Sequence, residues 1–262
     1  MADTFSVTSP GNQGSPLICG FNTGQHMILD SSDKCNKASF DFSGTATSRQ
    51  FDIKVTQFAC GDEMGGPDGC LQYFTGTTGS FASFNFPTTG TTVTSTVTHL
   101  SSQCYTMCFR QEEGKCAICF DTVIPGAATA AVIDQGSFGL SISSDGDPKG
   151  TQDTGCSTDY LQIPGAEADA AAPFNFVVGS VPDFLHERIC GRFFGFASDA
   201  TMVGADNNLA SICTAQTPFR VLFKTDSDED LTATTDSSTS EQVDGPGGII
   251  GFYLNYALQD CQ

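Results

Sequence analysis

The fold class of this chain follows from one stretch near its carboxyl end, Gly251-Phe252-Tyr253-Leu254-Asn255-Tyr256. Large apolar side chains at 252, 254 and 256 alternate with Tyr253 and Asn255, so an extended chain would carry them on one face. A period of two with aromatic residues on one face is typical of a half-buried antiparallel strand. The same alternation occurs at residues 38–42, 51–55 and 219–223, which we also predict to be strands.

Turn-rich segments separate these strands, and helical patterns are scarce. Short helices are predicted only at Ala127–Gln135 and Asp183–Ile189. A chain of 262 residues is long enough for a substantial hydrophobic core, in one large domain or two small ones. Many short strands with few helices indicate an all-β protein built as an antiparallel β-sandwich.

The predicted strands belong to a loose internal repeat. Its second copy contains, in order, Asp159–Ile163, Ile189-Cys190-Gly191, Cys213, the strand around Phe219, and Gly251–Tyr256 ending in Cys261. Its first copy contains Asp3–Val7, Ile18-Cys19-Gly20, Cys35, the strand around Phe40, and Gln50–Val55 ending in Cys60. Three cysteines and four strands correspond, which indicates one supersecondary unit used twice.

These motifs resemble the CUB domain, an extracellular sandwich of two antiparallel sheets. The resemblance rests on Cys156, Asp159–Ile163, Cys190-Gly191, Phe219–Phe223 and Gly251–Tyr256, in the order in which a CUB module carries them. The amino-acid sequences of three other stretches are similar to those of secreted CUB-containing proteins of arthropods. These stretches are Ile18–Met27, Ile53–Gln57 and Cys70–Gly76. The resemblance therefore implies a disulfide-rich, CUB-like jelly-roll in the extracellular space.

The resemblance also predicts the domain organisation. Residues 1–60 match the C-terminal half of a CUB-like module, and residues 61–262 match a complete module with an acidic Ser/Thr-rich insertion near 225–247. Half a sandwich cannot close a core alone. The first unit is therefore expected to dock on the second, to pair with another chain, or to belong to a longer precursor.

Twelve cysteines point to an oxidising compartment, and their even number suits six disulfides. The resemblance implies the pairs Cys156–Cys190 and, for the opening of the second module, Cys70–Cys108. If the Phe219 strand and the last strand are antiparallel neighbours, Cys213 would pair with Cys261, and the repeat would then pair Cys35 with Cys60. Four cysteines remain: Cys19 in the first unit, and Cys104, Cys116 and Cys119 in the middle of the chain. Cys19 is expected to form a disulfide with one of the three central cysteines.

A zinc site is the alternative use of the central cysteines. Cys104-x3-Cys108 and Cys116-x2-Cys119 have spacings that suit a tetrahedral four-cysteine site in a reducing cytosol. Disulfides are preferred here, because eight other cysteines accompany them in a chain that resembles an extracellular fold.

Charge and hydropathy exclude two classes of partner. Thirty acidic against eleven basic residues give a net charge of −19, which repels nucleic-acid phosphates and anionic membrane surfaces. No apolar stretch approaches the roughly 18 to 20 residues of a membrane span. The polar sequence after Met1 contains no secretory leader, so the chain is expected to be a mature or recombinant form of a secreted protein.

A calcium site is implied by some CUB domains, which bind the ion through an early Glu, the Asp of the Asp-Tyr strand and an Asp before the last strand. Asp159 matches the second position, and Asp226 or Asp228 could supply the third. Ser141 stands about where the Glu would fall, so the expected site is incomplete and weak. The alternative is an acidic loop without an ordered ion.

No catalytic residues are predicted. The three histidines, His26, His99 and His186, are far apart in sequence, and the chain lacks hydrolase and phosphate-loop motifs. We therefore predict a non-enzymatic secreted module that binds an extracellular protein or glycan or builds a matrix, with self-association through an exposed sheet edge. The alternatives are a calcium-dependent recognition domain and, in another class, a hydrolase whose site is not visible as a motif.

Overall fold

The computed structural model describes residues 3–11, 14–45, 48–89, 98–123, 138–141, 150–152, 155–169, 186–191, 194, 211–227, 229 and 249–261. All twelve cysteines lie within these ranges. The predicted helix at Ala127–Gln135 and most of the acidic insertion lie outside them. The described residues contain no helix long and apolar enough to cross a membrane.

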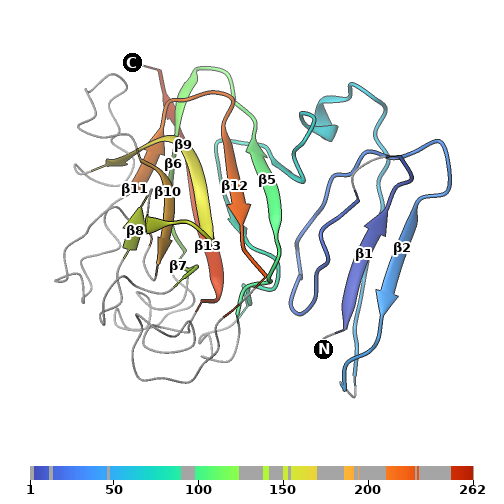
Figure 1. Cartoon of the computed structure of the whole chain (residues 1–262). Coiled ribbons are helices and arrows are strands. Elements are labelled where there is room, and N and C mark those ends of the chain that lie inside the picture. Colours follow the sequence, from blue (N-terminus) through green and yellow to red (C-terminus); the bar gives the residue numbers. More distant parts are fainter. Residues whose placement is uncertain are drawn as a thin grey trace, which may run out of the picture.

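Two layers of strands form the body of the protein (Figure 1), as the sandwich prediction requires. One layer has the order β3 (Gln72–Phe74), β5 (Cys104–Phe109), β12 (Arg220–Lys224), β9 (Tyr160–Asp169), β10 (His186–Gly191) and β8 (Gly150–Gln152). The other has the order β9, β11 (Ser211–Thr214), β6 (Lys115–Thr122), β13 (Gly251–Asp260) and β4 (Thr78–Ala82), with β7 (Phe138–Gly139) also pairing with β13. These pairings are antiparallel except between β3 and β5.

Strand β9 joins the two layers because it changes neighbours half-way along. Its first residues, around Leu161, pair with β12, and its last residues, around Ala168, pair with β11. Between them lies Gly165 with a φ of +62°, a conformation that costs glycine little. A β-carbon at this position would also meet the side chain of Gln216 at 2.9 Å. The corner of the sandwich therefore depends on this glycine.

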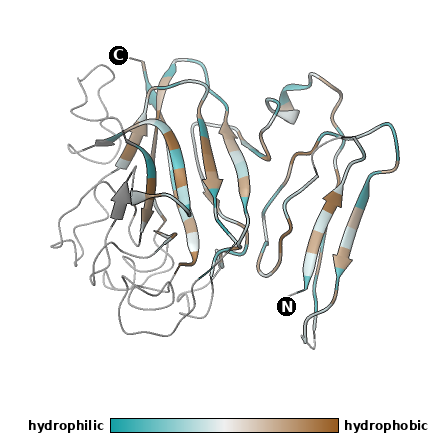
Figure 2. Cartoon of the chain, in the orientation of Figure 1, coloured by the Kyte–Doolittle hydropathy of each residue, from teal (hydrophilic) through white to brown (hydrophobic). Residues whose placement is uncertain are grey.

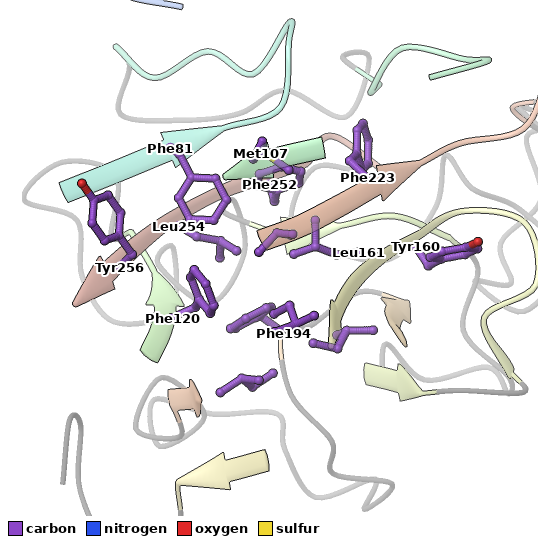
Figure 3. Packing of buried hydrophobic residues seen from close by; sticks show 14 of the residues in the cluster. Phe81, Met107, Phe120, Tyr160, Leu161, Phe194, Phe223, Phe252, Leu254 and Tyr256 are labelled. Atoms are coloured by element: carbon purple, nitrogen blue, oxygen red, sulfur yellow. The ribbon is translucent and has the colours of Figure 1, made fainter. Parts of the chain in front are cut away.

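Aromatic side chains from both layers meet in the core (Figure 3). Phe109 of β5 contacts Phe81 of β4 with ring centroids 5.0 Å apart, and Phe223 of β12 contacts Phe252 of β13 at 5.3 Å. Along β13 the side chains of residues 252, 254 and 256 are buried while those of residues 253 and 255 are partly exposed. The alternation in the sequence therefore correctly predicted both the strand and its buried face.

Three of the four strands predicted from alternation are confirmed: β2 (Lys37–Asp41), β12 and β13. The strand predicted at residues 51–55 is wrong, because these residues join no sheet and Phe51, Ile53 and Val55 are exposed. The helix predicted at Asp183–Ile189 is also wrong over 186–189, which belong to β10 and pair with its neighbours. Alternation shows which side chains share a face, but a strand also needs a neighbour to bond.

Four disulfides connect the sandwich. The structure has Cys156–Cys190 and Cys70–Cys108, the two pairs that the family resemblance implied. Cys213–Cys261 is wrong: Cys213 bonds Cys119, and Cys261 bonds Cys116. The reason is the strand order, because β6 lies between β11 and β13 and carries a cysteine for each of them. Strand β12, expected beside β13, lies in the other layer between β5 and β9.

Four cysteines are thiols in the structure, namely Cys19, Cys35, Cys60 and Cys104, so the expectation of six disulfides is wrong. The pair Cys35–Cys60 is absent, and residues 51–55 form no strand that pairs with β2. The four-cysteine zinc site is excluded as well, since Cys108, Cys116 and Cys119 are all used in disulfides.

Peptide mapping without reduction should recover the linked pairs Cys119–Cys213 and Cys116–Cys261. Cys213 and Cys119 lie directly opposite each other on adjacent antiparallel strands, with Cα atoms 4.0 Å apart. A fragment that links Cys213 to Cys261 would contradict the strand order β11-β6-β13.

The N-terminal residues form a separate two-stranded sheet beside the sandwich (Figure 1), from β1 (Thr4–Thr8) and β2. The segment that connects these strands lies on the sandwich. Ile28 donates a backbone hydrogen bond to the carbonyl of Leu71 at 2.7 Å, and Gln103 donates its side-chain amide to the carbonyl of Leu17 at 3.2 Å. Ile18 is buried in the main core. A short 3-10 helix, η1 (Glu63–Gly65), follows before β3.

The repeat seen in the sequence is also a repeat of strand pairing. In the second copy, Leu161 is paired with Ile189 on one side and with Phe223 on the other. In the first copy, Phe5 is paired with Ile18 on one side and with Phe40 on the other. Corresponding strands therefore have corresponding neighbours in both units.

Candidate metal centre

Three chain segments meet at one edge of the sandwich and bring together His99, Asp159 and Glu229. Strand β12 runs antiparallel to both β5 and β9, with Lys224 opposite Cys104 and Tyr160. The end of β12 therefore lies beside the starts of β5 and β9. His99 precedes β5, Asp159 precedes β9 and Glu229 follows β12, which places one potential ligand atom from each within 4.8 Å of the others.

Hydrogen bonds hold the segments before β5 and after β12 together. Gln103 donates its backbone N–H to the Thr225 hydroxyl at 2.9 Å, and that hydroxyl donates to the carbonyl of Leu100 at 2.7 Å. Ser102 donates its backbone N–H to the carbonyl of Asp226. This edge is therefore held together by hydrogen bonds of the main chain and of the Thr225 hydroxyl.

The carboxylates of the cluster are buried and incompletely bonded. Asp159 is 1% exposed, and its Oδ1 accepts a hydrogen bond from the backbone N–H of Asp226 at 2.6 Å. Asp159 Oδ2 and both carboxylate oxygens of Glu229 have no hydrogen-bond partner among the described residues. The side chain of Glu229 is only 8% exposed, so water reaches it poorly. Buried carboxylate oxygens are normally bonded, so these three favour a positively charged neighbour, and the His99 ring lies 3.4 Å from one of them, Glu229 Oε1.

The ring of His99 is oriented towards this gap. Its Nε2 lies 3.3 Å from the carbonyl oxygen of Leu140, a distance at which an Nε2–H can donate. Its Nδ1 lies 3.4 Å from Glu229 Oε1 and 3.4 Å from the carbonyl oxygen of Leu100. If the ring is neutral with its proton on Nε2, the lone pair of Nδ1 faces the carboxylates.

The protonation of the cluster reflects its burial. Burial raises the pKa of Asp159 to about 6, although the hydrogen bond from Asp226 and the nearby imidazole oppose the shift. Burial works against a charged His99, but the carboxylates of Glu229 and Asp159 outweigh it and raise the histidine pKa. The two shifts have different causes: burial raises the pKa of Asp159, whereas the neighbouring carboxylates raise the pKa of His99.

The residues expected to bind calcium from the CUB resemblance do not all meet in the structure. Asp159 lies in the cluster, Asp226 contributes its backbone N–H to it, and Asp228 lies outside the described residues. Ser141, where the early Glu was expected, accepts a hydrogen bond from the backbone N–H of Gly191 at 3.1 Å. Calcium takes six to eight oxygen ligands. The described cluster offers an imidazole nitrogen and two carboxylates, which do not fit that preference.

Sequence reasoning missed two members of the cluster. Glu229 belongs to the acidic run after β12, which was noted, but nothing distinguished it from its neighbours. His99 follows no motif and is sixty residues from Asp159, so only the packing of β5 beside β12 and β9 beside β12 reveals it. His26 has another role: its Nε2 accepts the backbone N–H of Tyr73 at 3.1 Å and helps to hold the N-terminal segment on β3.

A second feature of the molecule is a group of exposed apolar side chains on the N-terminal unit. We call it the aromatic surface; its members are Phe40, Phe42, Phe51, Ile53, Val55 and Phe58, which are 37–81% exposed. The ring of Phe40 lies 4.6 Å from that of Phe51 and 5.8 Å from that of Phe42. In Figure 2 apolar segments are visible on both strands of this unit.

Among the comparisons with known proteins, the family match agrees with the fold. A family model described as the animal CUB domain matches residues 67–259. The CUB1-EGF-CUB2 domain of human MASP-1/3 is 15% identical, with 98% of this chain and 81% of that chain covered and a TM-score of 0.27. The CUB1-EGF-CUB2 domains of rat MASP-1 are also 15% identical, with 98% and 80% covered and a TM-score of 0.28. No curated protein matches the chain.

Proposed function

The chain belongs to the animal CUB domain family, and on that premise we propose that it is a secreted, non-enzymatic module that binds extracellular protein through its aromatic surface. Animal CUB domains are commonly extracellular protein-binding modules, typically rich in disulfides. The observation that carries the proposal is the exposure of three neighbouring phenylalanine rings, Phe40, Phe42 and Phe51, on a strongly acidic protein. Contiguous exposed apolar groups of this kind mark interaction sites, and aromatic side chains supply much of the energy at interfaces.

The architecture around the aromatic surface supports the same proposal. Among the described residues, β1 and β2 form a sheet of two strands, which a single bridge from Phe5 to Ile18 extends. Two-stranded sheets are marginal in water and present open edges to which another strand can bond. The aromatic surface lies on β2 and on the residues that follow it. A partner that covers the rings could therefore pair with the edge of β2 at the same time.

A second copy of the chain is the first partner that we propose, which would make matrix assembly the biological role. Two copies with a net charge of −19 repel each other at long range, while the aromatic rings attract only on contact. Added salt screens this repulsion beyond the Debye length, which is about 8 Å at physiological ionic strength. Association through the aromatic surface should therefore strengthen as salt is added, the opposite of the behaviour of an ion-paired interface.

The double variant Phe40→Ser/Phe51→Ser should weaken this association strongly. Light scattering at several protein and salt concentrations would measure it, with Met64→Ser as the matched control, because Met64 is 53% exposed but is not part of the aromatic surface. Removal of two exposed rings should weaken dimerisation by at least about tenfold, since each lost anchor costs more than about 1 kcal/mol. A wild-type protein that stays monomeric at every concentration, or equal losses in the control, would contradict the proposal.

A glycan is the alternative ligand for the aromatic surface. Binding of the wild type and the same variants to an array of neutral glycans would test it.

We also propose an arthropod origin, supported by the amino-acid sequences of Ile18–Met27, Ile53–Gln57 and Cys70–Gly76. The domain division into a half-module at 1–60 and a complete module at 61–262 is proposed on the repeated pairing of Phe5 and Leu161.

A further inference from the structure

We propose that His99, Asp159 and Glu229 bind a divalent transition-metal ion of the zinc class, in place of the calcium ion that the sequence resemblance suggested. The proposal does not depend on the aromatic surface or on the partner proposed above. It rests on the unpartnered oxygens of the cluster, on an internal comparison between the two repeats, and on the chemistry of the three donors.

The unpartnered oxygens point to a cation within the cluster. Asp159 Oδ2 and the two carboxylate oxygens of Glu229 are buried without a hydrogen-bond partner among the residues that the structure describes. Asp159 is 1% exposed, and the side chain of Glu229 is 8% exposed. Burying carboxylate oxygens without a hydrogen bond is costly, whereas a bound metal ion satisfies them directly.

The first repeat shows what the corresponding aspartate requires. Asp3 occupies the place of Asp159, and its Oδ1 accepts the backbone N–H of Gly44 at 2.8 Å, much as Asp159 Oδ1 accepts that of Asp226 at 2.6 Å. The Oδ2 of Asp3 is then bonded by the guanidinium of Arg49, whose Nε lies 2.6 Å away. In the second repeat no Lys or Arg among the described residues takes this role at Asp159 Oδ2. Among the described residues the positive charge at this place can come from His99, and a bound metal ion would supply it directly.

The donor set favours a transition metal over calcium. An imidazole nitrogen with two carboxylates suits zinc and its neighbours, while calcium prefers oxygen alone. Tetrahedral zinc places adjacent ligand atoms about 3.4 Å apart, and His99 Nδ1 lies 3.4 Å from Glu229 Oε1. The other ring nitrogen of His99 faces the carbonyl oxygen of Leu140 at 3.3 Å, which is the usual outer partner of a metal-bound histidine. Three protein ligands would leave one position for water or a partner's side chain.

The test is a metal titration of the full chain after its accessible thiols have been alkylated, because Cys35, Cys60 and Cys104 are exposed and thiolates bind zinc. We expect one zinc ion per chain by calorimetry and no competition from calcium at equal concentration. Cobalt used as a spectroscopic substitute should show ligand-field bands of low symmetry without the charge-transfer band of a cobalt–thiolate bond.

Two conservative variants locate the site. Glu229→Gln and Asp159→Asn keep the size of the side chains, and each should weaken zinc binding by at least about tenfold, the scale at which even outer partners of a metal act. Asp3→Asn is the matched control, since it makes the same change at the equivalent aspartate of the first repeat and should leave binding unchanged.

Specific outcomes would overturn the proposal. These are no stoichiometric zinc binding by the alkylated wild-type chain, a cobalt spectrum dominated by thiolate, calcium binding as tight as zinc, or full binding in both cluster variants. If the alkylated wild-type chain binds no zinc, the positive charge beside the two carboxylates would have to be that of a protonated His99. The wild-type titration and the cobalt spectrum decide the matter even if a cluster variant fails to fold.

Discussion

Replacing Phe252 with alanine is expected to lower the free energy of unfolding by about 3–5 kcal/mol. Phe252 is completely buried at the centre of the sandwich (Figure 3), where its ring contacts Phe81 at 5.6 Å and Phe223 at 5.3 Å. The loss combines the transfer of a large apolar side chain with the cavity that remains, because Phe81 and Phe223 are held by different strands and cannot both move in.

Phe51→Ala is the matched control for this substitution. The same side chain is removed, but Phe51 is 60% exposed and its ring packs on that of Phe40 in the N-terminal unit. Its loss should cost less than about 1 kcal/mol. Urea denaturation followed by circular dichroism would compare the two variants with the wild type. Equal effects would mean that the layers of the sandwich do not pack as the structure shows.

The double variant Cys119→Ala/Cys213→Ala should lose about 2–5 kcal/mol of stability. This disulfide joins two adjacent strands across a sequence separation of 94 residues, so without it the unfolded chain gains much conformational freedom. Both sulfur atoms are fully buried, so the variant also loses packing between β6 and β11. Changing both cysteines avoids leaving a buried thiol that could form a wrong pair.

Cys104→Ala serves as the control for the disulfide variant, because Cys104 is an exposed thiol at the start of β5. Its substitution should change stability by no more than about 0.5 kcal/mol. Thermal unfolding in the absence of reductant would measure both. A large loss for the Cys104 variant would indicate that this cysteine has a partner in solution, and no loss for the double variant would contradict the Cys119–Cys213 pair.

Local pattern was sufficient for the elements that are half-buried. Strand β13 was predicted because its apolar residues alternate strictly, and this alternation exists because one side of the strand faces the core. The repeat predicted more, since Asp159–Ile163 and Asp3–Val7 proved to have corresponding partners on both sides. The resemblance of the same residues to CUB modules indicated the sandwich and pointed to Asp159 as a residue of interest.

The same kind of pattern failed at residues 51–55. These residues alternate as regularly as β13, yet Phe51, Ile53 and Val55 are exposed and join no sheet. Alternation reports the spacing of apolar side chains, and it contains no information on whether a neighbouring strand is present to bond the backbone. Because residues 51–55 have no paired strand, their alternating apolar side chains form an exposed surface instead of a buried face.

The sequence by itself thus determined the all-β class, the faces of the core strands and the repeated unit, because these depend on residues close together along the chain. Only the tertiary structure decided the partners of Cys213 and Cys261 and the meeting of His99 with Asp159 and Glu229. Both outcomes depend on which strands become neighbours: β6 between β11 and β13, and β12 between β5 and β9. That order is a choice among many long-range pairings, settled by how all the apolar faces pack together, and no local stretch of sequence encodes it.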